Sequence, residues 1–167
     1  MKYLLPDELV AKAREVVEAN RRAGRRVAVA ESCTGGLVSA AITEIPGSSE
    51  MFEAGYVTYS NAAKMAELNV SQDVVETFGS VSVATAWAMA QGALAASDAD
   101  IAVAITGIAG PDGGTEQKPV GTVVLARAER RPGPDEIVAD QKLFDAKGGR
   151  SGIRLQAALC ALDLLMP

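Results

Sequence analysis

Histidine is absent from this 167-residue sequence. Its absence excludes Ser-His-Asp catalysis, Cys-His catalysis and metal sites that depend on histidine ligands. If the protein is a hydrolase, its general base must therefore be a lysine, tyrosine, aspartate or glutamate.

Long apolar runs are absent as well. No run reaches the length of a membrane-spanning helix. The opening MKYLLP is too short, and too soon followed by Asp7 and Glu8, to be a signal peptide. The only two cysteines, Cys33 and Cys160, lie far apart in the chain, which indicates free thiols in a reducing compartment. We therefore expect a soluble, cytoplasmic protein that does not bind a membrane.

Aromatic residues make up only 4% of the chain, although 49% of its residues are apolar. The core must therefore be built from Ala, Val, Ile and Leu, which suits helices packed tightly on a sheet.

The 16 basic residues are outnumbered by 21 acidic ones, and the net charge of −5 argues against binding of nucleic acid. The length predicts one domain over residues 1–167. The acidic surface and the apolar last helix permit a homodimer.

Hydrophobic periodicity predicts an α/β fold in which helices alternate with strands before three strands follow one another directly. The first three strands should be parallel with right-handed crossovers, and strand four should be antiparallel. The predicted fold is a three-layer α/β/α sandwich on a mixed five-stranded sheet. The expected helices span 6–20, 35–45, 61–68, 71–78, 82–97 and 151–165; the expected strands span 27–30, 53–60, 100–106, 120–128 and 137–144, with a turn at 130–136.

The stretch VAVAESCTGG, residues 27–36, passes from a buried strand to a helix within about four residues. Ligands bind at the carboxyl ends of such strands, and Ser32 lies at this junction. Ser32 is either a helix cap or a nucleophile, with Gly35 and Gly36 letting a substrate approach the backbone. Cys33 is the alternative nucleophile, but without a histidine to hold a thiolate it fits better as a small buried filler.

A second polar stretch, YSNAAK, follows the second expected strand at residues 59–64. If Asn61 caps the short helix, Lys64 becomes its third residue, where the helix dipole opposes a cation. The pKa of such a lysine is lowered, as a general base requires. The alternative is an ordinary surface lysine.

Two further stretches could bind an anion. The glycine-rich TGIAGPDGG, residues 106–114, leaves the most buried strand and is followed by Lys118. Its backbone N–H groups could hold a phosphate, whereas the alternative is a flexible hairpin loop. At the start of the last helix, Arg150 could reach a phosphate or carboxylate, or it could simply be solvated.

Together these stretches resemble the CinA carboxy-terminal-domain family. The matching motifs are AESCTGG (30–36), YSNAAK (59–64), TGIAGPDGG (106–114) and KPVGTV (118–123), with GSS at 47–49 and VS at 81–82. The resemblance extends from residue 27 to residue 165. It implies a three-layer sandwich and a nicotinamide-nucleotide amidohydrolase. Such an enzyme converts nicotinamide mononucleotide to nicotinate mononucleotide and ammonia in pyridine-nucleotide salvage, by a serine–lysine mechanism without metal or cofactor.

The resemblance also implies roles for individual residues. Ser32 becomes the nucleophile, Lys64 its base and Tyr59 an assisting group, with Ser48 as a second candidate nucleophile. The oxyanion would be held by backbone N–H groups near Ser32 or at Gly35 and Gly36. The expected binding residues for the small nucleotide substrate are Thr34, Gly35, Gly36, Ser48, Asn61, Thr106, Gly107, Gly110 and Arg150.

The chain departs from the family pattern before the last helix. The family has roughly Phe-x-Gly-Asp-Arg there, whereas Phe144 is followed here by the longer DAKGGR, which lacks the Asp before Arg150. Two other functions stay open. One is serine–lysine hydrolysis of another amide, and the other is non-catalytic binding of a nucleotide or a partner protein.

Overall fold

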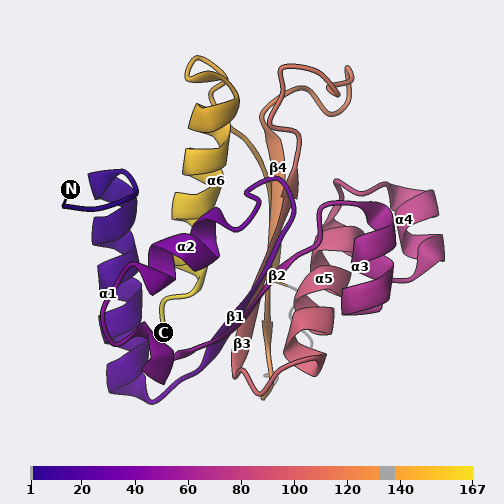
Figure 1. The fold of residues 1–167 in the computed structure, drawn as a ribbon. Coiled ribbons are helices and arrows are strands. Elements are labelled where there is room, and N and C mark those ends of the chain that lie inside the picture. The colour runs from indigo at the N-terminus through magenta and orange to yellow at the C-terminus, as the bar shows by residue number, and fades with distance from the viewer. Residues whose placement is uncertain (1, 132–137) are drawn as a thin grey trace.

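A five-stranded sheet forms the middle layer of the protein, whose computed structural model describes residues 2–131 and 138–167 (Figure 1). The sheet order is β2-β1-β3-β4-β5. β1 is parallel to β2 and β3, and β4 is antiparallel to both β3 and β5. The predicted mixed sheet with an antiparallel strand four is therefore confirmed. The strands are β1 (Val27–Glu31), β2 (Phe52–Val57), β3 (Ile101–Gly107), β4 (Thr122–Glu129) and β5 (Val138–Leu143).

Helices cover both faces of the sheet and complete the expected three layers (Figure 1). One face carries α1 (Asp7–Ala23), α2 (Leu37–Thr43) and α6 (Gly149–Leu164). The other carries α5 (Val83–Ala95), with α3 (Asn61–Leu68) and α4 (Gln72–Phe78) outside it. A short 3-10 helix, η1 (Ser48–Glu50), precedes β2. Most of the expected turn, residues 132–136, lies outside the described residues.

The two faces of the central strands differ in side-chain size. On β1, Val27 and Val29 pack toward α1, α2 and α6, whereas Ala28 and Ala30 pack toward α5. On β3, valine and isoleucine likewise alternate with alanine. Because successive strand residues point to opposite faces, this alternation leaves a small-residue surface for the Ala-rich α5. The scarcity of aromatic residues therefore fits close packing of α5 on the sheet.

Several element boundaries differ from those expected. α2 starts at Leu37 because Gly35 and Gly36 both have positive φ angles, which are not helical. β2 ends at Val57, so the next residues form a connection to α3. The expected Asn61 cap is wrong, since the N–H of Ala63 donates to Ser60 Oγ at 3.1 Å. Lys64 is consequently the fourth residue of α3.

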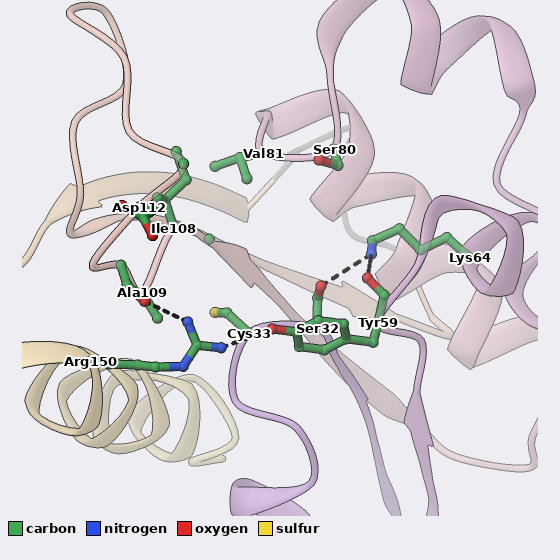
Figure 2. Close-up of a pocket in the computed structure, with 13 residues that line it drawn as sticks. Ser32, Cys33, Tyr59, Lys64, Ser80, Val81, Ile108, Ala109, Asp112 and Arg150 are labelled. Carbon is green, nitrogen blue, oxygen red and sulfur yellow. Dashed lines mark hydrogen bonds between the residues drawn. The ribbon is translucent and has the colours of Figure 1, made fainter.

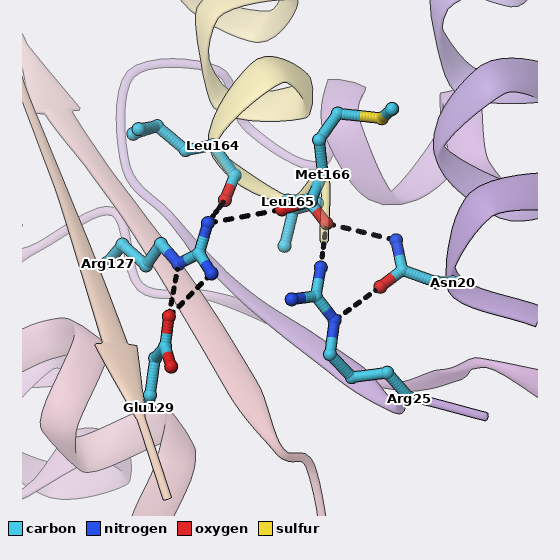
Figure 3. Close-up of polar contacts among 7 residues, drawn as sticks. All are labelled: Asn20, Arg25, Arg127, Glu129, Leu164, Leu165 and Met166. Atoms are coloured by element: carbon cyan, nitrogen blue, oxygen red, sulfur yellow. Dashed lines mark hydrogen bonds and ion pairs between the residues drawn. The ribbon is translucent and has the colours of Figure 1, made fainter. Parts of the chain in front are cut away.

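The end of α6 is held by side chains from β4, from α1 and from the connection after α1 (Figure 3). Arg127 on β4 donates from Nη1 to the carbonyl oxygens of Leu164 and Met166, at 3.0 and 3.1 Å. Arg25 and Asn20 both donate to the carbonyl oxygen of Leu165. Cations at this end also complement the helix dipole. These contacts set the position of α6, whose first turns reach the candidate site.

The carboxyl end of β1 is a topological switch point. From β1 the chain passes through α2 to β2 on one side, and then through α3, α4 and α5 to β3 on the other. Crevices form where strand order reverses in this way, outside the carboxyl ends of the strands. Ser32 is the first residue after β1. Within residues 2–131 and 138–167, no helix combines the length and the apolar character needed to cross a membrane.

Candidate active site

A pocket of about 260 Å³ opens at the carboxyl ends of β1 and β3 (Figure 2). Five segments line it. They are Ser32 and Cys33 after β1, Tyr59 and Lys64 around the start of α3, Ser80 and Val81 before α5, residues 107–110 with Asp112 and Gly113 after β3, and Arg150 on α6.

Ser32 and Lys64 meet in this pocket, although 31 residues separate them in the sequence. Lys64 Nζ lies 3.1 Å from Ser32 Oγ, and both side chains are buried (Figure 2). The N–H of Thr58 donates to the carbonyl oxygen of Glu31 and joins the two segments, and the N–H of Ser32 donates to the carbonyl oxygen of Ile105 on β3. The sheet therefore brings the hydroxyl and the amine together.

Burial favours the neutral form of Lys64. Its side chain is 1% exposed, and burial lowers its pKa from the ordinary value of 10.5. Nζ is also 2.9 Å from the carbonyl oxygen of Thr58 and 3.2 Å from that of Tyr59. Carbonyl oxygens only accept hydrogen bonds, so a neutral amine donates its two hydrogens to them. Its lone pair is then left to accept the hydroxyl proton of Ser32.

Cys33 also lines the pocket, but it is poorly suited to nucleophilic attack. Its side chain is 5% exposed, and burial raises its pKa to about 11. The thiolate is the nucleophilic form of cysteine, so this thiol is largely unreactive near neutral pH.

The loop that carries Ser32 is held from both sides. Glu31 is fully buried, and its carboxylate accepts hydrogen bonds from the N–H groups of Gly36, Val38 and Ser39 and from Ser39 Oγ, at 2.8–3.1 Å. From α6, Arg154 donates to the carbonyl oxygens of Cys33 and Thr34, at 3.1 and 2.8 Å. The loop after β1 is thus held in place by the Glu31 carboxylate and the Arg154 guanidinium.

Arg150 links two walls of the pocket (Figure 2). Its Nη1 donates to the carbonyl oxygen of Gly110 at 2.6 Å, and its Nη2 donates to the hydroxyl of Tyr59 at 2.9 Å. Tyr59 is 60% exposed, and it approaches Lys64 through its backbone carbonyl. The hydroxyl of Tyr59 therefore accepts its hydrogen bond from Arg150 at the edge of the pocket.

The structure brings together six of the predicted site residues: Ser32, Tyr59, Lys64, Gly107, Gly110 and Arg150. Of the two places expected to supply oxyanion donors, Gly35 and Gly36 are wrong, whereas the N–H groups near Ser32 stay a prediction. The N–H of Gly35 donates to the carbonyl oxygen of Ser32 at 3.0 Å, and that of Gly36 donates to Glu31 Oε2 at 3.1 Å. Both groups are already used within the chain.

Four other predicted binding residues also lie outside the lining of the pocket. Thr34 is fully buried behind the loop. Ser48 begins η1, and Asn61 is an exposed first residue of α3. Thr106 is buried on β3, where its hydroxyl donates to the carbonyl oxygen of Ser80 at 2.7 Å.

Sequence reasoning assigned no role to several contributors. Ser80 and Val81 follow a helix rather than a strand, and only the resemblance of VS at 81–82 marked their neighbourhood. Arg154 could have been found from its spacing, because residues four apart lie on the same helix face and Arg150 was a candidate. In the described part of the chain, no three His, Cys, Asp or Glu side chains form a cluster that could hold a metal ion.

Comparison with known proteins places the chain in a family. The CinA C-terminal domain matches residues 10–167. A nicotinamide-nucleotide amidohydrolase PncC from Pseudomonas putida is 46% identical over 160 residues, which cover 96% of each chain. A CinA-like protein from Syntrophomonas wolfei is 49% identical over 142 residues, which cover 85% of this chain.

The relatives differ in length. This chain spans 33% of the Syntrophomonas wolfei protein, about a third, but nearly all of the Pseudomonas putida protein. Among solved structures, the competence/damage inducible protein CihA from Agrobacterium tumefaciens superposes with a TM-score of 0.90 and 44% identity, covering 97% of this chain and 96% of its own. The resemblance indicated by the four motifs is confirmed, and the chain belongs to the CinA C-terminal domain family.

Proposed function

We propose that this protein hydrolyses the carboxamide of nicotinamide mononucleotide to nicotinate mononucleotide and ammonia. The observation that carries the proposal is the contact of 3.1 Å between Lys64 Nζ and Ser32 Oγ, in a buried site where two carbonyl oxygens accept the hydrogens of a neutral amine. The names of relatives that match nearly the whole chain, such as the Pseudomonas putida protein, support the choice of substrate.

In the first half-reaction, Ser32 acts as the nucleophile and Lys64 as the general base. Lys64 Nζ takes the hydroxyl proton while Ser32 Oγ bonds to the carboxamide carbon, and the carbonyl electron pair moves to oxygen. When that pair returns, the C–N bond breaks. The nitrogen takes the proton from Lys64 and leaves as ammonia, and the nicotinoyl group remains as an ester on Ser32.

The second half-reaction uses water. Lys64, neutral again, accepts a proton from water as the water oxygen attacks the ester carbon. The C–O bond to Ser32 then breaks, and Lys64 returns the proton to Ser32 Oγ. The net change is amide plus water to carboxylic acid plus ammonia, and both catalytic side chains are restored.

Arg150 is the candidate phosphate ligand in this proposal. Its guanidinium has five N–H donors and, within the described part of the chain, uses two of them, on Gly110 and Tyr59. The remaining donors suit a phosphate oxygen. The glycine-rich loop beside it, residues 107–113, would contact the ribose.

The test is to incubate purified protein with nicotinamide mononucleotide and to measure ammonia and nicotinate mononucleotide in equal amounts. Ser32→Ala and Lys64→Met should each lower kcat at least about 1,000-fold, since residues that act as one unit fail together. Ser48→Ala separates the two candidate serines and should keep the activity, because Ser48 does not line the pocket. Loss of activity only in Ser48→Ala would overturn the assignment. If the protein hydrolyses another amide and does not hydrolyse nicotinamide mononucleotide, the proposed substrate is wrong.

A further inference from the structure

At the short segment between α4 and α5, every backbone carbonyl oxygen from residue 78 to residue 81 accepts a hydrogen bond from a side chain. Lys118 Nζ donates to the carbonyl oxygens of Phe78 and Val81, at 3.3 and 2.7 Å. The carbonyl oxygen of Ser80 accepts from Thr106 Oγ1 at 2.7 Å. That of Gly79 accepts from two hydroxyls on the α5 side, those of residues 82 and 85.

These bonds determine where the N–H groups of the segment point. Across a planar trans peptide, the C=O of one residue and the N–H of the next point in opposite directions. The N–H of Val81 therefore points away from Thr106 and the sheet, and the N–H of Ser80 points away from α5. In the described part of the chain neither N–H donates a hydrogen bond. Both residues line the pocket with Ser32 (Figure 2).

The pocket wall formed by Ser80 and Val81 is suited to bind a negatively charged oxygen through its N–H groups. The N–H groups of Gly35 and Gly36 donate within the chain, so an oxyanion needs donors from other residues that line the pocket. Backbone N–H groups held in place before the reaction stabilise an oxyanion without reorganisation. The side chains that donate to the carbonyl oxygens of residues 78–81 hold the N–H groups of Ser80 and Val81 in place in this way.

We propose that Thr106 is a positioning residue for the amide hydrolysis, and that it acts by aiming the N–H of Val81 at the oxygen of the tetrahedral intermediate. The inference rests on the proposed function. As Ser32 Oγ bonds to the carboxamide carbon, the carbonyl π pair becomes a lone pair on that oxygen. The N–H groups of Val81 and Ser80 then donate to the oxyanion and keep their protons. When the C–N bond breaks, the pair returns and the carbonyl forms again.

Thr106→Val tests the proposal because valine keeps the shape of threonine and removes only the hydroxyl. The carbonyl of Ser80 loses its donor, and we expect kcat for nicotinamide mononucleotide to fall at least about tenfold. KM should change less than about twofold, because Thr106 does not line the pocket. Thr106→Ser keeps the hydroxyl and should restore kcat to within about threefold of the wild type.

Thr122→Val is the matched control. Thr122 is also a buried strand threonine, and its hydroxyl donates to the carbonyl oxygen of Pro119 at 2.7 Å. Its replacement removes the same kind of bond at a residue that does not line the pocket and does not hold Ser80 or Val81, so kcat should stay within about twofold of the wild type. A kcat in Thr106→Val equal to that of this control would overturn the proposal, as would an equal loss in Thr106→Val and Thr106→Ser.

A second measurement reports on the oxyanion itself. Thionicotinamide mononucleotide carries sulfur in place of the carboxamide oxygen, and a site built to hold an oxyanion should prefer the oxygen compound. That preference in kcat/KM should shrink at least about fivefold in Thr106→Val. Lys118→Met alters the surface side of the same wall and should also reduce the preference for the oxygen compound. This variant takes the place of Thr106→Val in the experiment if Thr106→Val does not fold. An unchanged preference contradicts the proposal. Absence of ammonia release by the wild type would instead reject the proposed function, and the inference with it.

Discussion

At the scale of single residues, the protonation state of Lys64 decides what the pocket can do. A protonated ammonium would donate to all three neighbouring oxygens and could not accept the hydroxyl proton of Ser32. A neutral amine satisfies the two carbonyls and keeps a lone pair for the hydroxyl. Burial shifts the balance toward that neutral form, because it penalises the charged one.

The activity should therefore rise with pH. The active form has lost a proton from Lys64, so kcat/KM increases as the pH approaches the pKa of this lysine and levels off above it. Because burial lowers that pKa, the plateau should begin below 10.5, the ordinary value. The measurement is the initial rate of ammonia release between about pH 6 and 10.

Lys64→Arg supplies the control for this profile. Arginine stays protonated throughout the range, so the variant should be inactive at every pH tested. Activity in Lys64→Arg, or a wild-type rate that falls as the pH rises from 6 to 9, contradicts a role for Lys64 as base.

Which residues form the site could be predicted from the sequence better than the role of each residue. A serine at the end of a buried strand and a lysine in the first turn of a helix stand out by position and chemistry. The sequence could not show that Ser60, one residue before Asn61, caps α3, because both residue types cap helices well. Nor could it show that Thr106 turns inward to Ser80, since that contact joins segments 26 residues apart.

At the scale of elements, the site depends on how α2 begins and how α6 ends. α2 has no cap from its own flanking residues, and its first N–H groups are held instead by Glu31, a buried carboxylate on the preceding strand. α6 is fixed at its far end by Arg25, Arg127 and Asn20, and its first two turns carry Arg150 and Arg154. The lengths of both helices were predictable only to within a few residues, because the glycines and the distant carboxylate decide where α2 starts.

Glu31→Gln should destabilise the protein by about 3 kcal/mol. Each carboxylate oxygen of Glu31 accepts two hydrogen bonds, so an amide group in either orientation turns an NH₂ toward two donors. Urea denaturation measures the loss. Glu67→Gln, at an exposed position of α3, is the control and should change the free energy of unfolding by less than about 0.5 kcal/mol. Equal losses in the two variants would show that Glu31 does not stabilise the start of α2.

Arg127→Met should lower the free energy of unfolding by about 2 kcal/mol. The methionine keeps most of the apolar stem, but it leaves the carbonyl oxygens of Leu164 and Met166 without their donor. Arg22→Met, at an exposed position of α1, provides the comparison in the same denaturation experiment. The anchoring role of Arg127 is refuted if both variants unfold at the same urea concentration.

At the scale of the whole molecule, the sheet brings distant segments to one edge. Ser32 and the glycine-rich loop follow the parallel strands β1 and β3, so their meeting could be predicted from strand order alone. The wall formed by Ser80 and Val81 could not, because its direction is set by side chains from β3 and from the loop before β4. Local sequence patterns thus indicate where the pocket opens, and long-range contacts complete its lining.

The layers of the fold should also control the reactivity of the two cysteines. Cys33 is packed in the core between the sheet and the α1, α2 and α6 layer, whereas Cys160 on α6 is half-buried. With a pKa of about 11, only about one thiol in a thousand at Cys33 is ionised at pH 8. Iodoacetamide should therefore label Cys160 first in the folded protein.

Cys33 lines the pocket but is 5% exposed, so its labelling should be slow in the folded protein and faster wherever the layers open. Peptide mapping by mass spectrometry after timed labelling gives both rates, and the same reaction in concentrated urea should label the two cysteines equally. Substitutions that weaken the core, such as Glu31→Gln, should speed the labelling of Cys33 while leaving that of Cys160 nearly unchanged. If Cys33 reacts as fast as Cys160 in the folded protein, the low reactivity inferred for the Cys33 thiol from its burial and raised pKa is wrong.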